Sequence, residues 1–145
     1  MKNHNGDNMN IEIKKYHFND LNNKLYDSDW LDAGLIISND SDSKKIKLEF
    51  LLVEELERIV FYLMELANNN YSKTKLEFID PNLKLKLFTR STIKVIKVLY
   101  YCGDRNIASW ELIANKVNLI MLADEIRMLV VAYPCRCGFT HENLN

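Results

Sequence analysis

The apolar residues of this chain follow two different periods, and the switch between them limits the folds that the chain can adopt. Over most of the chain apolar and polar residues alternate, as in residues 83–87, Leu-Lys-Leu-Lys-Leu. Alternation directs successive side chains to opposite faces of a strand, so these stretches predict half-buried strands. In residues 52–67 and 119–133, apolar residues recur every three or four positions, which is the period of an amphipathic helix.

Polar turns separate the alternating stretches. In Asp80-Pro81-Asn82, proline fixes its own φ angle, and Asp and Asn bond to their own backbone. Because such links are of hairpin length, we expect neighbouring strands to be antiparallel. The fold class is therefore predicted as α+β, with a mostly antiparallel sheet of about six or seven strands and two helices packed on one face. The predicted strands are residues 11–18, 30–38, 46–50, 75–78, 83–87, 92–101 and 107–114.

The length of 145 residues fits one domain, and 48% hydrophobic residues are enough for a core. We expect a single domain over residues 1–145, with flexible tails at residues 1–8 and 139–145. The near-neutral net charge of −1 provides no overall field that would attract nucleic acid or a membrane surface.

Two features predict a cytoplasmic protein that does not enter membranes. Residues 1–10 are polar and lack the apolar segment of a secretory signal. The longest nearly apolar stretch, residues 119–133, contains Asp124, Glu125 and Arg127 and is too short and too charged to span a bilayer. The odd count of three cysteines also favours reduced thiols over a disulfide framework.

No pattern of residues predicts catalysis, so we expect a protein that is not an enzyme, with no cofactor and no metal. The chain has no glycine-rich phosphate loop. Cys135, Cys137 and His141 could be imagined as metal ligands. However, only one residue separates the two cysteines, whereas structural zinc sites space paired cysteines by about two to four residues. A fourth ligand would have to be Cys102, which is distant in sequence. The remaining histidines, outside any motif, are His4 and His17.

A lysine-lined sheet face is one candidate for binding. Its predicted outward residues are Lys75, Lys84, Lys86 and Lys94. Sheets that bind nucleic acid usually add exposed aromatic rings on which bases stack. Here Phe50, Phe78 and Trp110 fall on the inward period, which favours a solvated face. A nucleic-acid or regulatory binding function through this face is kept as the alternative hypothesis.

The first predicted helix provides a candidate protein-binding site. Phe61 lies off the apolar stripe, among acidic side chains of the opposite face. An aromatic residue ringed by carboxylates would suit a basic protein partner, because aromatic side chains anchor interfaces and charge steers encounter. The alternative is that Phe61 packs under a neighbouring loop. The predicted partner-binding residues are Glu54, Glu57, Arg58, Phe61 and Glu65.

The second predicted helix is apolar on two faces. Besides its main stripe, it has Ile120, Met121, Met128 and Val131 on the opposite side. Such a helix is either enclosed within the fold or covered by a partner. Homodimerisation through this helix is therefore a hypothesis.

Four segments resemble the WapI-type immunity proteins of bacterial polymorphic-toxin and contact-dependent inhibition systems. The segments are residues 26–31 (Tyr-Asp-Ser-Asp-Trp-Leu), 52–58 (Leu-Val-Glu-Glu-Leu-Glu-Arg), 76–85 and the pair Tyr133-Pro134. Their order and spacing, over about residues 26–138, are more specific than any one of them. The chain departs from the family pattern at residues 115–118, Asn-Lys-Val-Asn, where that family often has Asp-Gln-Ser/Thr-Tyr.

The resemblance implies a cytoplasmic immunity protein. Such a protein binds a cognate toxin domain, often a nuclease, and blocks it by occlusion without chemistry of its own. Immunity proteins against nucleases are commonly acidic, and here the acidic face of the first helix is the feature that fits.

Overall fold

The computed structural model describes residues 8–16, 30–38, 43–69, 73–78 and 82–134. These ranges contain seven strands and two helices. In chain order they are β1 Asn8–Tyr16, β2 Trp30–Ser38, β3 Ser43–Leu52, α1 Val53–Ala67, β4 Lys73–Glu77, β5 Leu83–Arg90, β6 Ile93–Cys102, β7 Arg105–Ala114 and α2 Lys116–Ala132.

The predicted α+β class, the number of strands and their antiparallel pairing are confirmed, but the strands form two sheets instead of one. One sheet has the order β1-β2-β3 and the other the order β4-β5-β6-β7. Every strand pair is antiparallel. The division follows from the helix between them: β3 runs directly into α1, which takes the chain 15 residues further before β4 begins. No described residue of β3 pairs with β4.

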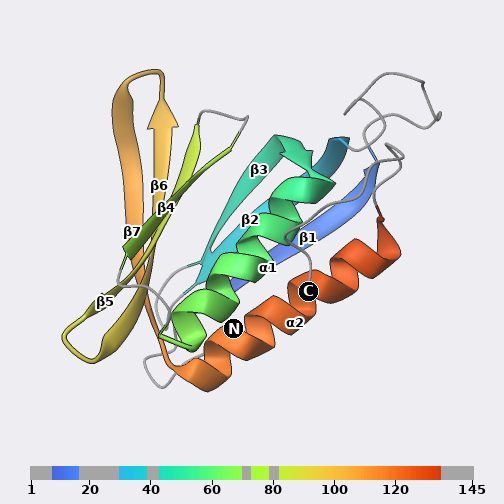
Figure 1. The fold of residues 1–145 in the computed structure, drawn as a ribbon. Helices are drawn as coiled ribbons and strands as arrows, with labels where there is room; N and C mark the ends of the chain where they lie inside the picture. The colour runs from blue at the N-terminus through green and yellow to red at the C-terminus, as the bar shows by residue number, and fades with distance from the viewer. Residues whose placement is uncertain (1–7, 17–29, 39–42, 70–72, 79–81, 135–145) are drawn as a thin grey trace.

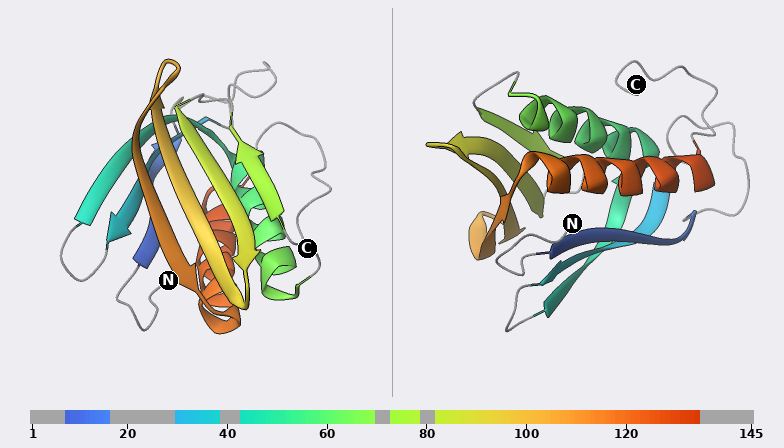
Figure 2. Two further views of the ribbon diagram at one scale, coloured as in Figure 1. Left: turned by 90° about the vertical axis from the view of Figure 1, so that its left-hand side faces the viewer. Right: turned by 90° about the horizontal axis from the view of Figure 1, so that it is seen from below.

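The two helices pack side by side and contact both sheets (Figure 1). α1 contacts β3 and β5, and α2 contacts β1. Figure 2 shows the helices covering one face of the three-stranded sheet, while the four-stranded sheet flanks the helix pair. Residues from all of these elements form one hydrophobic cluster, so the two sheets share a core.

Side chains at its start fix the position of α1. The carboxylate of Glu55 accepts a hydrogen bond from the backbone N–H of Leu52 at 2.9 Å. Glu54 and Glu55 both lie in the first turn, where the helix dipole favours negative charge. The helix ends at Ala67, Asn68 is its C-cap, and Asn69 beyond it has a positive φ of 58°. The predicted range of 52–67 is therefore confirmed to within one residue.

α2 begins three residues before its predicted start at residue 119. The cap is Asn115, whose side-chain oxygen accepts a hydrogen bond from the backbone N–H of Asn118 at 2.8 Å. β7 ends at Ala114, directly before this cap, so no polar loop marks the boundary in the sequence. The helix ends at Ala132, one residue before its predicted end at residue 133 and two before Pro134, which cannot continue a helix.

The register of the four-stranded sheet decides which side chains face the core. Leu85 on β5 lies opposite Leu76 on β4 and Val98 on β6, and all three are buried. The intervening residues face the other way, and Lys86 lies opposite Lys75 and Lys97. The outward direction predicted for Lys75, Lys84 and Lys86 is thus confirmed.

The outward direction predicted for Lys94 was wrong. Lys94 lies opposite Ala114 of β7, which is buried, and its ammonium group bonds to the side chain of Asn69 at the end of α1. Lys94 shares its side of β6 with Ile96 and Val98, two residues of the core. The alternation was shifted by one residue because the sequence does not mark where the β5–β6 turn ends.

Candidate partner-binding surface

Four of the five predicted site residues share one stripe of α1. Glu54, Arg58, Phe61 and Glu65 are spaced by four, three and four residues, and each is partly exposed. The ring of Phe61 makes an edge-to-face contact with that of Tyr62, with 5.1 Å between centroids. The structure therefore places an aromatic side chain and two carboxylates along one face of α1.

Glu57 does not belong to this exposed stripe, and the prediction that it faces outward was wrong. Its side chain is buried, with 4% of its surface exposed. The reason is the wide buried arc of α1, on which nine of its 15 residues are buried. A helix contacted by β3, β5 and α2 covers more of its circumference than the single apolar stripe in the sequence indicates.

Arg58 joins α1 to β4. One of its terminal nitrogens lies 3.6 Å from the buried carboxylate of Glu55 and donates a hydrogen bond to the backbone carbonyl of Glu77 at 3.4 Å. Glu55 is fully buried, so its charge needs this partner. Arg58 therefore has a structural role at this site besides any contact with a partner.

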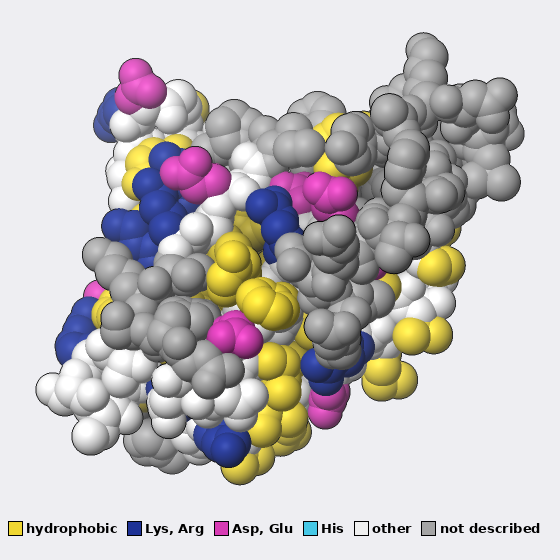
Figure 3. All heavy atoms as spheres, viewed as in Figure 1, with side chains coloured by type: hydrophobic (Ala, Val, Ile, Leu, Met, Phe, Trp, Pro, Cys, Tyr) yellow, Lys and Arg dark blue, Asp and Glu magenta, His cyan; other side chains and the backbone are white. Residues whose placement is uncertain are grey.

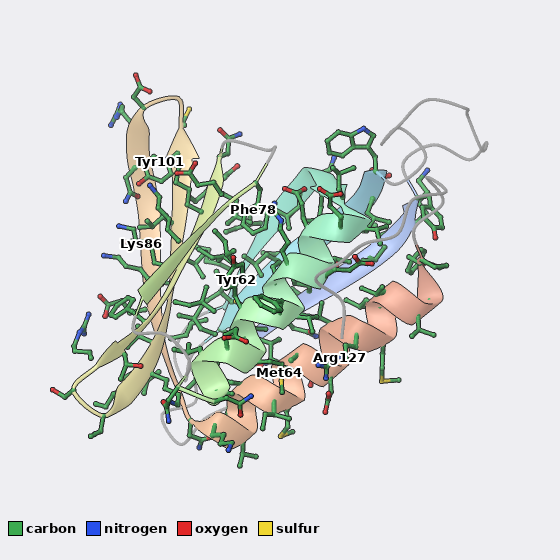
Figure 4. All side chains as sticks on the ribbon, viewed as in Figure 1. Tyr62, Met64, Phe78, Lys86, Tyr101 and Arg127 are labelled. Carbon is green, nitrogen blue, oxygen red and sulfur yellow. The ribbon has the colours of Figure 1, made fainter. Side chains whose placement is uncertain are left out.

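Aromatic residues continue the α1 surface toward the four-stranded sheet. Tyr62 on α1 and Phe78 directly after β4 are partly exposed and pack against the core (Figure 4). Phe78 and Trp110 both contact the core, which confirms their predicted inward direction; the side chain of Phe50 lies outside the described part. In Figure 3 hydrophobic side chains lie between α1 and the basic side chains over the four-stranded sheet.

The outer face of the four-stranded sheet is basic. Glu77 lies 3.0 Å from the ammonium of Lys75 and 4.0 Å from that of Lys84. The hydrogen bond from Lys75 lowers the pKa of the Glu77 carboxyl from its usual value. At the opposite edge, both carboxylate oxygens of Glu111 bond to Arg90, each at 3.1 Å. This pair lowers the pKa of Glu111 and raises that of Arg90.

Two aromatic residues of this outer face were missed by the sequence analysis. The guanidinium of Arg90 lies over the ring of Phe88 at 5.4 Å, and the ammonium of Lys84 lies over the ring of Tyr101 at 4.8 Å. The alternation contained the signal for Phe88, since it follows Lys84 and Lys86 at every second position. Tyr101 follows an irregularity in the β6–β7 register, which the sequence does not show.

α2 has an exposed apolar stripe, as predicted for Met121, Met128 and Val131. These residues and Val117 are from 50% to 80% exposed. Ile120, which was assigned to the same face, instead packs partly against the core. Asp124, in the middle of the stripe, forms an ion pair with Arg127 at 2.8 Å.

Within the described ranges, no group of three or more His, Cys, Asp or Glu side chains is placed to hold a metal ion. Cys135, Cys137 and His141 lie outside those ranges, so the hypothesis about them stays untested. Cys102 is exposed and free. A search of the described helices for a membrane span found none of sufficient length and hydrophobicity.

Comparison with known proteins identifies a family. The family model for WapI-like immunity proteins matches residues 1–134, which include every strand and helix described above. The match begins before residue 26, where the motifs of the resemblance start, and therefore includes the segment that contains β1. No curated protein and no solved structure matches the chain. The chain belongs to the WapI-like immunity protein family.

Proposed function

We propose that this protein binds a cognate toxin domain, with a nuclease as the class of toxin, and neutralises it by occlusion without catalysis. Membership of an immunity protein family supports toxin neutralisation in general. The observation that favours direct binding is the α1 stripe, in which Phe61 is flanked along the helix by Arg58 and Glu65. The site of action that we propose is the cytoplasm, where the toxin's substrate would be protected.

The α1 stripe suits a nuclease because such an enzyme holds its substrate phosphates with basic side chains. Glu54 and Glu65 would pair with those side chains, and Phe61 would bury its ring against the toxin. The stripe needs little ordering on binding, since Arg58 and the Glu55 cap hold α1 in place. No covalent step is required, because a bound protein excludes the substrate from the toxin's active site.

The test is co-expression with the toxin domain encoded immediately upstream of the gene for this chain. We expect wild-type protein to restore growth and to co-purify with the toxin. A toxin domain that remains lethal, and that does not bind the purified protein, would contradict the proposal. Measuring nuclease activity of the purified toxin with and without the protein tests the toxin class separately.

A second candidate function is nucleic-acid binding by the lysine face, and one observation favours it. Phe88 and Tyr101 provide this face with the aromatic side chains that the sequence analysis did not find there. A gel-shift series at increasing salt tests this function, because phosphate contacts produce a steep salt dependence. The absence of any shift at low salt would exclude it.

We also propose that two copies associate through α2. Its exposed stripe has the order Val117, Met121, Asp124, Met128, Val131, which is the same in either direction. Two such helices packed antiparallel would bring Val117 against Val131 and Met121 against Met128, as an interface with twofold symmetry requires. The two Asp124 side chains would meet at the axis, each neutralised by Arg127 of its own helix. Sedimentation at increasing concentration tests this association, and a monomer at every concentration would exclude it.

A further inference from the structure

We propose that the outer face of β4, β5 and β6 is a second docking surface for the same toxin domain and receives a cluster of carboxylates from it. This inference rests on the proposed function, and it adds a partner surface of opposite charge to the acidic stripe of α1. Its centre is a row of lysines that crosses three neighbouring strands.

The register places these lysines directly side by side. Lys86 on β5 is the direct neighbour of Lys75 on β4 and of Lys97 on β6. Adjacent strands are about 4.8 Å apart, and like charges directly opposite each other destabilise a sheet. The row therefore costs stability in the free protein. A bound anionic partner would neutralise the repulsion between the lysines, and the relief of that repulsion would add to the binding affinity.

The carboxylates of this face lie at the two ends of the row, and Lys86 at its centre has only lysines as direct cross-strand neighbours. Glu77 pairs with Lys75 and Lys84 at one end of the row. At the other end, Glu111 lies directly opposite Lys97 on β7, where it bonds to Arg90 and is also attracted by the charge of Lys97. Among the described residues, no carboxylate lies within ion-pair distance of Lys86 or Lys97. Figure 4 shows Lys86 extending from the sheet on the side away from the helices.

The surroundings of the row favour a protein over a nucleic acid. Bases stack on open aromatic faces, but Phe88 and Tyr101 each have a cation over the ring. The guanidinium fork of Arg90, which would match a phosphate, is bound at both nitrogens by Glu111.

The lysine row and the α1 stripe are close enough for one partner to contact both. Arg58 of α1 bonds to the backbone carbonyl of Glu77, and the carboxylate of Glu77 pairs with Lys75. Figure 3 shows the two surfaces on one side of the molecule, with hydrophobic side chains between them. A toxin with basic and acidic regions would thus meet a complementary pattern, which also fixes its orientation.

The experiment compares the double variant Lys86→Gln/Lys97→Gln with wild-type protein for binding to the toxin domain encoded immediately upstream. We expect the dissociation constant to rise by about tenfold or more and the association rate to become less sensitive to salt. The midpoint of thermal unfolding should stay the same or rise, because like-charge repulsion is removed. Lys44→Gln, at an exposed lysine of β3, is the matched control and should bind like wild-type protein.

The outcomes separate the two proposals. If wild-type protein binds the toxin and the double variant binds within about twofold of it, the lysine row is not a docking surface, while the proposed function stands. If wild-type protein does not bind the toxin, both proposals fail. If a single-stranded RNA oligonucleotide binds wild-type protein more tightly than the toxin does, and the double variant loses that binding, the assignment to a protein partner is overturned.

Discussion

Arg58 on α1 donates a hydrogen bond across 3.4 Å to the backbone carbonyl of Glu77, the last residue of β4. The same guanidinium faces the buried carboxylate of Glu55, which accepts a hydrogen bond from the backbone N–H of Leu52, the N-cap of α1. One side chain thus links the helix with the proposed toxin contacts to the edge strand of the basic sheet.

Replacing Arg58 with alanine should destabilise the fold by about 1–3 kcal/mol, because the charge of Glu55 would stay buried without its partner. The loss of unfolding free energy should be smaller than for a fully buried ion pair, since the Arg58 side chain is 35% exposed. Urea unfolding followed by circular dichroism measures this change. Arg58→Ala/Glu55→Gln should recover part of the loss, and a single variant as stable as wild type would contradict the account.

Asn115→Ala should destabilise the protein by about 1 kcal/mol, because the side chain that caps α2 is lost. Lys116→Ala changes an exposed residue in the same turn without touching the cap, and its effect should stay within about 0.5 kcal/mol. The midpoints of thermal unfolding of the two variants and of wild-type protein measure these effects. Equal stability of the two variants would mean that Asn115 is not the cap.

The ion pair between Arg90 and Glu111 should make stability depend on pH in the acid range. Pairing holds the folded pKa of Glu111 below its unfolded value of about 4.3. The stabilisation is therefore complete above that unfolded value and disappears as the pH falls through the folded pKa. Melting temperatures of wild type and Glu111→Gln should differ most near neutral pH and converge in acid. A difference that persists at the lowest pH would argue against this pair as the cause.

Met128→Glu should abolish self-association through α2 without reducing stability, because the side chain is 72% exposed in the single chain. A charge at this point of the stripe would have to be desolvated between the two helices. Sedimentation of Met128→Glu and of Lys116→Glu, which lies at an exposed non-stripe position, tests the effect. Equal self-association of both variants would show that the stripe is not the interface.

Phe61→Ala should weaken toxin binding at least about tenfold, equivalent to 1.4 kcal/mol, while changing the unfolding midpoint little. Phe61 is partly exposed and lies outside the group of aromatic residues that pack against the core. Lys14→Ala, at an exposed position of β1, is the control. Calorimetric titration of the toxin with each variant measures the difference, and unchanged affinity of Phe61→Ala would remove α1 from the interface.

Local patterns in the sequence were sufficient for most elements of the fold. Strict alternation in residues 83–87 placed Lys84 and Lys86 outward, and the apolar period of residues 52–67 located α1 to within one residue. These features depend on residues that are close in sequence, so they can be predicted from the sequence of one chain. The family pattern indicated a function, which periodicity could not do, because the pattern consists of several segments in a fixed order.

Features that depend on distant segments could not be predicted. The burial of Glu57 depends on how much of α1 the two sheets and α2 cover. The lysine row appears only when the register of β4, β5 and β6 is known, because Lys97 was not assigned to the outward face without it. The division into two sheets likewise depends on which strands pair across α1.

The most direct test of the central claim is to titrate the purified upstream toxin domain with this protein while recording both binding and toxin activity. The account predicts a tight complex of fixed stoichiometry and a loss of toxin activity that follows complex formation, with no change to the toxin's covalent structure by mass spectrometry. Full toxin activity in the presence of excess protein, with no complex detected, would contradict it.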